Sequence, residues 1–424
     1  MTHQTQSSAA ACCDEFARLT STSRRGLLRG ALLGGLAVTL GDAVITTSPA
    51  SAATARAVMV VLSLRGAADG LSLVVPHGDP VYYQARPRIA VPADKLIAKD
   101  DFFGLHPAFE PLLPMWNAGS LAAVHAAGLP APNRSHFSAM EELEDAAPGS
   151  STRTGWLNRL IGADSIASPL QAFALGSGPV PASLIGPEPA MAASSVGNVK
   201  IPGADVKKGE ADPRLRSLHQ LWDGRSDDLG RAMSASFGAV ADFATVANGS
   251  ADPQNGATYP SSDLGRALAQ VARIVRADVG VEVVTIDHGN WDMHSDMGNL
   301  QWGDVKTKTT ELAGSLAAFF TDLGTLAEKV TVVCLSEFGR RVVENANWGT
   351  DHGYGTTMFA LGAGVKGGYH GRWPGLTKTG DADVLVTTDY RSVLTEVVRS
   401  RFNASIPAVF PGFTPTRVGM MVGQ

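Results

Sequence analysis

Short apolar runs of strand length recur along the chain, and they constrain its fold more than any other feature. The first run, 57–64, has almost no polar alternation, which is typical of a strand buried on both faces. Helical patterns separate several of the runs, and this alternation predicts an α/β fold with a mostly parallel central sheet and helices on both faces. The other predicted strands are 121–126, 171–175, 281–286, 330–335 and 357–361. The predicted helices are 138–145, 155–161, 264–277, 306–327 and 390–402.

Residues 1–52 have the order of an export signal. The motif SRRGLL (23–28) precedes an apolar run, 31–40, and the small-residue stretch SPASA (48–52) follows. This order is typical of a signal peptide that is removed, and the adjacent arginines resemble a twin-arginine signal, which the machinery that exports folded proteins recognises. A membrane anchor is the alternative, but Arg29 and several glycines interrupt the run, and a spanning helix needs about 20 apolar residues. We therefore expect a periplasmic or extracellular protein.

The remainder, 53–424, has the composition of a globular domain. The whole chain is 44% hydrophobic and carries 35 basic against 40 acidic residues, which argues against a basic nucleic-acid-binding protein. Cys334 is the only cysteine after residue 52, so no internal disulfide is expected, and no later segment has the length and hydrophobicity of a membrane span. The middle segment, 177–262, is rich in turn-forming residues and is predicted to be an insertion or cap with a helical stretch near 227–247.

Carboxylates and histidines gather where the predicted strands begin or end. Ligands in open α/β sheets bind beyond the carboxyl ends of the strands, so we expect these side chains to converge. Several carboxylates at close range repel one another unless cations neutralise them, and interleaved histidines favour a divalent metal ion. Mixed nitrogen and oxygen ligands suit zinc first, with manganese, magnesium or calcium as alternatives. The candidate ligands are Asp69, Asp292, His294, Glu337, Asp351 and His352. Ordinary turns and helix caps are the alternative explanation for each of them.

Ser135 is the candidate nucleophile. It follows the loop 130–134 and opens a predicted helix, whose N-terminus would stabilise a developing anion. A nearby divalent ion would activate its hydroxyl group. The alternative is that Ser135 only caps the helix. Arg134 and Arg340 are candidate oxyanion-binding residues, or else they pair with carboxylates.

Several stretches of the chain resemble an exported bacterial family known as domain of unknown function 1501, whose members are distant relatives of alkaline phosphatases and sulfatases. The stretches extend over almost all of 53–424 apart from the middle segment, and the resemblance implies an alkaline-phosphatase-like domain over these residues, with 177–262 as its insertion or cap. The matching stretches are LRGAADGLSLVVPHGDPVYYQARP (64–87), FFGLHPAFEPLLP (102–114), RSHFSAMEELE (134–144), GWLNRL (155–160), NWDMHSDM (290–297), SEFGRR (336–341) and TDHGYGTTMFALGAGVKGG (350–368).

The wider superfamily suggests a role for each candidate. Its members hold one or two divalent ions at the strand ends, beside a nucleophile at a helix start. By this resemblance Asp69 bridges the ions and Ser135 is the nucleophile. The implied ligands are Asp292, His294 and His352 for one ion, Glu337 for the other, and Asp351 as a further candidate. The chain departs from the superfamily pattern where an Asp-His pair is replaced by Glu337 and Phe338, so the second ion lacks an imidazole.

These observations predict an exported, metal-dependent hydrolase that cleaves phosphate or sulfate esters of a small molecule or a polymer. The alternative is a non-catalytic exported binding or assembly protein of the same fold, in which any metal ion is structural. A third interpretation is a serine hydrolase whose triad combines Ser135, His136 or His352, and an aspartate. Neither a nucleophile elbow of the G-x-S-x-G type nor a phosphate-binding P-loop is present in the sequence.

Overall fold

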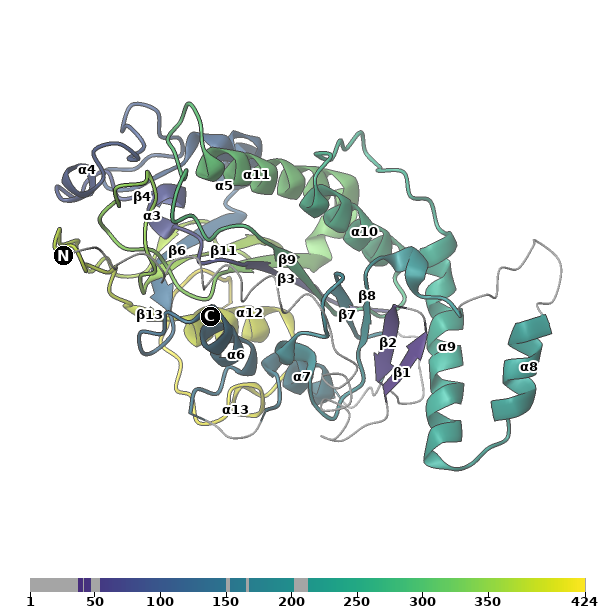
Figure 1. The fold of residues 1–424 in the computed structure, drawn as a ribbon. Coiled ribbons are helices and arrows are strands. Elements are labelled where there is room, and N and C mark those ends of the chain that lie inside the picture. The colour runs from purple at the N-terminus through teal and green to yellow at the C-terminus, as the bar shows by residue number, and fades with distance from the viewer. Residues whose placement is uncertain are drawn as a thin grey trace, which may run out of the picture.

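One large sheet runs through the middle of the molecule (Figure 1). The structure, a computed structural model, describes residues 37–40, 42–46, 54–149, 153–164, 168–201 and 213–423. Within these residues the strand order is β1-β2-β8-β7-β9-β3-β10-β11-β6-β12, and β13 also pairs with β6. The strands are β1 (Ala37–Leu40), β2 (Ala43–Thr46), β3 (Val58–Leu64), β6 (Leu121–Gly128), β7 (Ala172–Leu175), β8 (Met191–Ala193), β9 (Val283–His288), β10 (Val330–Leu335), β11 (Thr356–Gly362), β12 (Gly368–His370) and β13 (Thr388–Asp389). A separate two-stranded sheet contains β4 (Val74–Val75) and β5 (Gly104–Leu105).

Strand direction determines where the loops meet. The neighbours β8, β7, β9, β3 and β10 pair in parallel, so they all end at the same edge of the sheet. β11 is antiparallel to both β10 and β6, so β6 also ends at that edge and β11 begins there. The segments that follow β3, β6, β9 and β10, and the one that precedes β11, therefore converge.

Burial on both faces of the sheet is clearest in β3. All of its residues are buried. Because successive side chains of a strand point to opposite faces, Val58, Val60 and Leu62 join one hydrophobic cluster while Met59 and Val61 join another. Burying one such aliphatic side chain contributes about 1.5–3 kcal/mol. This two-sided packing explains why the run has no polar alternation.

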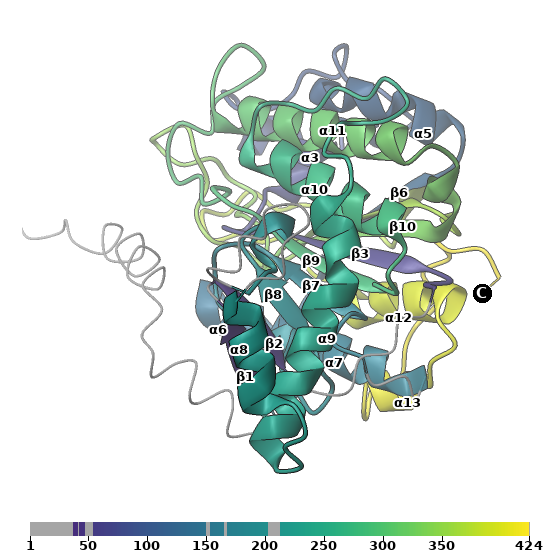
Figure 2. The ribbon, with the colours of Figure 1, turned by 90° about the vertical axis from the view of Figure 1, so that its right-hand side faces the viewer.

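Helices cover both faces of the sheet (Figures 1 and 2). On one face lie α3 (Gly70–Leu73), α5 (Leu113–Asn117), α10 (Asp263–Ala277) and α11 (Asp304–Leu323), with α4 (Tyr82–Ala85) at their end. On the other face lie α6 (His136–Asp145), α7 (Trp156–Ile161), α12 (Tyr390–Arg401) and α13 (Ile406–Val409). The helix α9 (Asp228–Asn248) lies beside β1 and β2, and α8 (Pro213–Trp222) lies on the far side of α9. Short 3-10 helices occupy Pro107–Leu112, Gly162–Asp164, Ala182–Leu184, Val196–Asn198 and Gly324–Lys329.

The predicted α/β class is confirmed, and each predicted strand and helix has a counterpart in the structure. The main difference in length is at α11, predicted to reach residue 327. It ends at Leu323 because Gly324 adopts a positive φ of 53°, and a 3-10 helix follows. Among the described residues, no helix is both long and apolar enough to cross a lipid bilayer.

The middle segment, 177–262, is partly built into the sheet. Its strand β8, which the sequence did not predict, pairs with β7 and with β2. The predicted helical stretch near 227–247 corresponds to α9, and Phe243 on this helix stacks on Phe173 of β7 with ring centroids 5.1 Å apart. The helix α8 was also not predicted.

The predicted signal peptide is described only in part. Its residues 1–36, 41 and 47–52 lie outside the described residues. The remainder contributes β1 and β2, and Thr46 bonds to Ala190 beside β8 through both its backbone and its hydroxyl group. Signal cleavage after residue 52 stays a prediction.

Candidate metal centre

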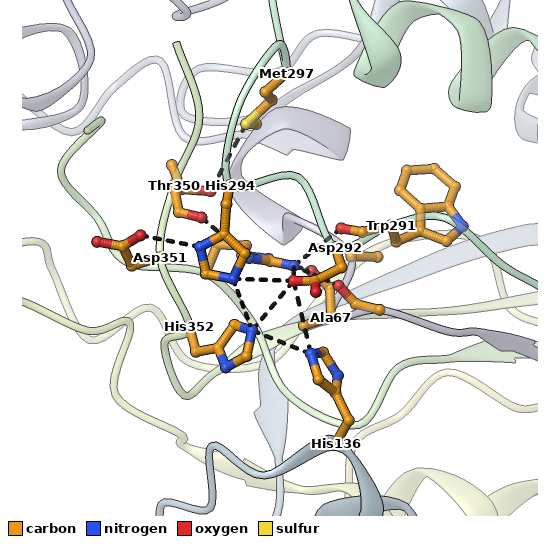
Figure 3. A network of polar contacts seen from close by, with 12 residues as sticks. Ala67, His136, Trp291, Asp292, His294, Met297, Thr350, Asp351 and His352 are labelled. Atoms are coloured by element: carbon orange, nitrogen blue, oxygen red, sulfur yellow. Dashed lines mark hydrogen bonds and ion pairs between the residues drawn. The ribbon is translucent and has the colours of Figure 1, made fainter. Parts of the chain in front are cut away.

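Three histidines and one aspartate converge beyond the carboxyl edge of the sheet (Figure 3). His136 is the first residue of α6, after β6, and Asp292 and His294 lie in the loop after β9. His352 lies just before β11. We call these four residues the His–Asp cluster. The strand directions described above explain why segments so far apart in sequence meet here.

The nitrogen Nε2 of His352 lies at the centre of the cluster. It is 3.0 Å from Nε2 of His136, 3.0 Å from Nε2 of His294 and 3.1 Å from Oδ1 of Asp292. Asp292 Oδ1 is also 3.1 Å from Nε2 of His294 and 3.6 Å from Nε2 of His136. One donor atom from each of His136, Asp292 and His352 lies within 4.8 Å of the others, which is close enough to share one metal ion.

The other ring nitrogen of each histidine is bound to an acceptor. His136 Nδ1 lies 2.7 Å from Oε1 of Glu337, and His294 Nδ1 lies 3.0 Å from Oδ1 of Asp351. His352 Nδ1 lies 3.0 Å from the backbone oxygen of Arg134. Ionised carboxylates and carbonyls only accept hydrogen bonds, so each Nδ1 carries the hydrogen.

Because each Nδ1 is engaged, the Nε2 atoms and the Asp292 oxygen are left as potential ligands for a cation. In the neutral rings the three Nε2 atoms carry lone pairs; each lies within 3.6 Å of Asp292 Oδ1, and that of His352 lies 3.0 Å from each of the other two. Electron-rich atoms this close repel one another unless protons or a cation lies among them. Histidines that ligate metals commonly donate the other ring hydrogen to a carboxylate or a carbonyl, as all three do here. Imidazole nitrogens with one carboxylate oxygen suit zinc and similar divalent ions. The donor atoms of His136, Asp292 and His352 therefore fit a single divalent metal ion, with Nε2 of His294 next to them.

Protons occupy the cluster when no ion is bound. Burial disfavours the charged ring of His136, but hydrogen bonds to Asp292 and Glu337 raise its pKa to about 9. The hydrogen bond to Asp292 also raises the pKa of His294, against the effect of burial. Burial alone would raise the pKa of Asp292, yet its histidine neighbours and Arg340 hold that pKa far below its usual range. A metal ion would have to displace protons to bind.

Glu337 holds His136 in place. It is 1% exposed, and its Oε1 accepts hydrogen bonds from His136 and from the backbone N–H of Gly66 at 2.9 Å. Its Oε2 accepts from the hydroxyl of Ser336 at 3.1 Å. Both oxygens of Glu337, which was predicted as a ligand of a second ion, are thus engaged by protein groups, and Oε1 orients a histidine. Beside it, the ring of Phe338 packs against the imidazole of His136, with the ring centroids 4.9 Å apart.

Arg340 is enclosed by the loops of the site. Its guanidinium is 1% exposed, and its Nη2 donates to Oδ1 of Asp292 at 2.6 Å. It also donates to the backbone oxygens of Ala67 at 2.8 Å, Thr350 at 3.0 Å and Trp291 at 3.1 Å. The predicted oxyanion-binding residue therefore fixes a carboxylate of the cluster and ties three loops together.

Gly66 permits the close approach of two of these loops. Its φ is +111°, and a Cβ built on it would lie 2.5 Å from the backbone nitrogen of Asp292. Any side chain would therefore both strain the backbone and push the loop that carries Asp292. A glycine is needed at this position for the cluster to form.

Asp69 lies in a different environment from the one predicted. Its Oδ2 is 2.5 Å from Nη1 of Arg86 and its Oδ1 is 2.9 Å from Nη2, a two-point ion pair that is almost completely buried. The guanidinium of Arg86 also donates hydrogen bonds to the backbone oxygens of Arg341 at 2.8 Å and Val342 at 2.9 Å. The structure thus brings Asp69 to a guanidinium, which occupies both carboxylate oxygens, and does not bring it into the His–Asp cluster.

Ser135 and Arg134 flank the cluster. Ser135 is exposed at the start of α6, directly before His136, and its side chain makes no capping hydrogen bond. The predicted alternative, a helix cap only, is therefore not what the hydroxyl does in this structure. Arg134 pairs through its side chain with Asp383, which also accepts from Arg341 at 3.0 Å. Both predicted residues thus lie at the rim of the site.

His136 is the residue that sequence reasoning did not identify as a ligand. In the sequence, His136 stood out only as a possible member of a serine hydrolase triad. The predicted helix began two residues later, so His136 was not placed at a helix start beside the site. Its position next to Ser135, just after a predicted strand, was the available signal. Asp351, a predicted ligand, instead orients His294 through the hydrogen bond given above.

Some solved structures are similar to the chain at low sequence identity. The C-terminal periplasmic domain of EcEptC from Escherichia coli, in complex with Zn, is 9% identical over 75% of this chain and 77% of that chain, with a TM-score of 0.31. Phosphonoacetate hydrolase from Sinorhizobium meliloti 1021, in complex with phosphonoacetate, is 11% identical over 73% of this chain and 61% of that chain, with a TM-score of 0.26. Ps i-CgsB is 11% identical over 82% and 73%, with a TM-score of 0.33. Scores this low do not establish a shared fold.

Sequence comparison with a protein family gives a firmer relationship than the solved structures do. No curated protein matches the chain by sequence. A family model described as "Protein of unknown function (DUF1501)" matches residues 56–397, which include every residue of the His–Asp cluster and the carboxylates that orient it. The chain therefore belongs to the DUF1501 family.

Proposed function

We propose that this chain is an exported, metal-dependent hydrolase of phosphate or sulfate esters. One observation carries the proposal: every Nδ1 of the three clustered histidines is bound to an acceptor, so the three Nε2 atoms face Asp292 Oδ1 with lone pairs available to a cation. When the protons leave the cluster these atoms repel one another, and a cation that binds among them in place of the protons relieves that repulsion.

A bound divalent ion would be held by His136, Asp292, His294 and His352, with zinc as the first choice. Such an ion supplies Lewis acidity, which polarises a phosphoryl or sulfuryl oxygen and activates a nucleophile. The chain itself supplies the positioning. Glu337 and Asp351 hold two of the imidazoles, and Arg340 holds the carboxylate.

Ser135 is the nucleophile in this proposal. It is exposed, its hydroxyl is not used as a helix cap, and it directly precedes a residue of the cluster. The unsatisfied N–H groups at the start of α6 would favour the negative charge that develops during attack. Arg134, whose side chain is 40% exposed, can reach an ester oxygen if it leaves Asp383.

A structural metal site in a non-catalytic protein is the second candidate. Four protein donors complete a tetrahedral shell, and closed shells are typical of structural zinc. However, the side chains of His294 and Asp292 are 33% and 25% exposed, so the cluster is open to solvent on one side. This exposure favours a site that a substrate can reach.

The two candidates are separated by measuring metal content and turnover together. The purified full chain is analysed for bound metal and assayed on aryl phosphates and aryl sulfates with added zinc, manganese, magnesium or calcium. The double variant Asp292→Ala, His352→Ala should lose both metal and turnover. A matched control is His219→Ala, Asp223→Ala, an exposed pair 3.1 Å apart at the C-terminal end of α8, which should keep both metal and turnover.

Three results decide between the candidates. Ser135→Ala should keep the metal and lose turnover. Bound metal without ester turnover in the wild-type chain would favour the structural site. Absence of metal in the wild-type chain after loading would remove the proposal altogether.

A further inference from the structure

We infer that Trp302, supported by Trp348, forms a subsite for a sugar ring of the ester substrate. The inference rests on the proposed function and adds the chemical class of the group that carries the ester.

Trp302 presents an exposed indole. It is 41% exposed, and it is the only tryptophan among the exposed large hydrophobic side chains of the described residues. Its ring centroid lies 5.4 Å from that of Trp348, with the planes inclined by 59°. A single exposed apolar side chain is ordinary on a protein surface, but this indole packs on a second tryptophan at the end of the loop that carries Asp292.

Trp348 is a fixed support for that indole. Its φ of +59° lies in the left-handed region, which is rare for a bulky side chain and persists only where the surroundings hold it. The Oδ1 of Asn345 accepts hydrogen bonds from Asn347 N at 2.9 Å and Gly349 N at 3.1 Å, which closes the turn around Trp348. The guanidinium of Arg88 lies 5.0 Å from the centre of the Trp348 ring.

The same turn is tied to the His–Asp cluster. The Nδ2 of Asn345 donates to the backbone oxygen of His294 at 2.8 Å and lies 3.3 Å from Oδ1 of Asp351, which orients the His294 ring. A Cβ built on Gly349 would lie 2.3 Å from the carbonyl carbon of His294, so these backbones are in close contact. The aromatic pair is therefore held beside the proposed reaction centre by rigid, short connections.

Trp302 lies in a second turn, which backbone hydrogen bonds link to the turn around Trp348. The backbone N–H of Gly298 donates to the oxygen of Trp348 at 3.3 Å, and that of Asn299 donates to the oxygen of Trp302 at 2.8 Å. The loop after β9 thus carries both Asp292 and Trp302. A substrate whose ester group lies at the cluster could extend along this loop toward the indole.

The chemistry of the surroundings selects a sugar ring. The face of an indole is electron-rich and attracts the C–H groups on the apolar face of a pyranose ring. Exposed amide side chains of Gln301 and Asn347 accompany the pair, together with the half-exposed Arg88, and these groups can bind hydroxyls at the ring edge. A plain aryl group would stack on the indole but would leave the amides unused.

Binding to the zinc-loaded full chain tests the subsite. Isothermal titration calorimetry compares glucose 6-phosphate and glucose 6-sulfate with phenyl phosphate and methyl phosphate. Trp302→Ala should weaken binding of both glucose esters by about tenfold, while Trp302→Phe, which keeps an aromatic face, should stay within about threefold of wild type. Methyl phosphate, which has no ring, should bind equally to all variants. Trp222→Ala on α8 is the control because Trp222 is a tryptophan outside the site that, like the supporting Trp348, has an arginine 5.0 Å from its ring centre.

Each other outcome overturns the inference. A loss confined to phenyl phosphate would assign the subsite to aryl groups. An equal loss for methyl phosphate would show general damage to the site. Ester hydrolysis by the wild-type chain with no effect of Trp302→Ala would remove the subsite and leave the proposed function intact, whereas absence of both binding and hydrolysis for every ester would remove the two together.

Discussion

His136 and Glu337 lie 201 residues apart in the chain, and their side chains meet at 2.7 Å. The carboxylate belongs to the loop after β10 and the imidazole to the first residue of α6. This contact decides which nitrogen of His136 faces the other histidines, so it sets the chemistry of the His–Asp cluster.

Removing the negative charge of Glu337 should weaken metal binding. In Glu337→Gln the amide can turn its N–H₂ group toward Nδ1 and disturb the tautomer, and loss of such an orienting partner typically costs about 10- to 100-fold in metal affinity. A competition titration with a zinc-binding dye measures the change. Glu396→Gln is the matched control because Glu396 is a buried carboxylate that accepts hydrogen bonds from the N–H groups of Val418, Gly419 and Met420. It should lower the melting temperature without changing zinc affinity; equal affinities for Glu337→Gln and wild type would contradict the assigned role.

Metal loading should reverse the pH dependence of stability. The pKa of His136 in the metal-free fold is raised from 6.5 to about 9, so its proton stabilises the fold fully below about pH 6.5, and this contribution is lost as the pH rises through about 9. The metal-free chain should therefore melt at a lower temperature near pH 9 than near neutrality. Zinc replaces the proton, so zinc affinity should rise over the same range. Thermal melts of chelated and zinc-loaded chain measure both trends, and parallel curves for the two forms would argue against binding at His136.

A side chain at Gly66 should disrupt the loop that carries Asp292. Gly66→Ala both strains a φ of +111° and places a Cβ 2.5 Å from the backbone of Asp292, so we expect a loss of about 2–4 kcal/mol in the free energy of unfolding, together with lost metal. The control Gly375→Ala has a similar φ of +79° but meets no atom within 4 Å. Urea unfolding of both variants isolates the effect of the clash. A variant at Gly66 as stable as the control would show that the loops can separate freely.

Asp69 should prove to be a stability residue. Asp69→Ala leaves Arg86 buried without its partner, and breaking a buried ion pair in this way typically costs about 3–5 kcal/mol. If the variant folds at low temperature, its metal content should equal that of wild type, as elemental analysis will show. Loss of metal from a folded Asp69→Ala variant would restore the bridging role that the resemblance to the superfamily implies.

The apolar runs of the sequence predicted the strands because burial on both faces is a local property that a short window records. They also predicted that Asp292 and His294 would lie at the carboxyl edge of the sheet, since parallel strands share one edge. His352 precedes β11 and reaches the same edge because β11 runs antiparallel to its neighbours, which the apolar run alone did not predict. The functions of Asp69 and Glu337 were beyond such reasoning, because each depends on a tertiary contact outside its own strand and loop: Arg86 lies 17 residues from Asp69, and His136 lies 201 residues from Glu337. Which oxygen or nitrogen faces a metal ion is fixed by these long-range contacts.

Anomalous diffraction at the zinc absorption edge tests the central claim most directly. In crystals of the zinc-loaded full chain, we predict one anomalous peak within about 2.0–2.2 Å of Nε2 of His136, His294 and His352 and of one carboxylate oxygen of Asp292. A peak at another place in the molecule, or none at all at full loading, would contradict the claim that these four side chains form a metal centre.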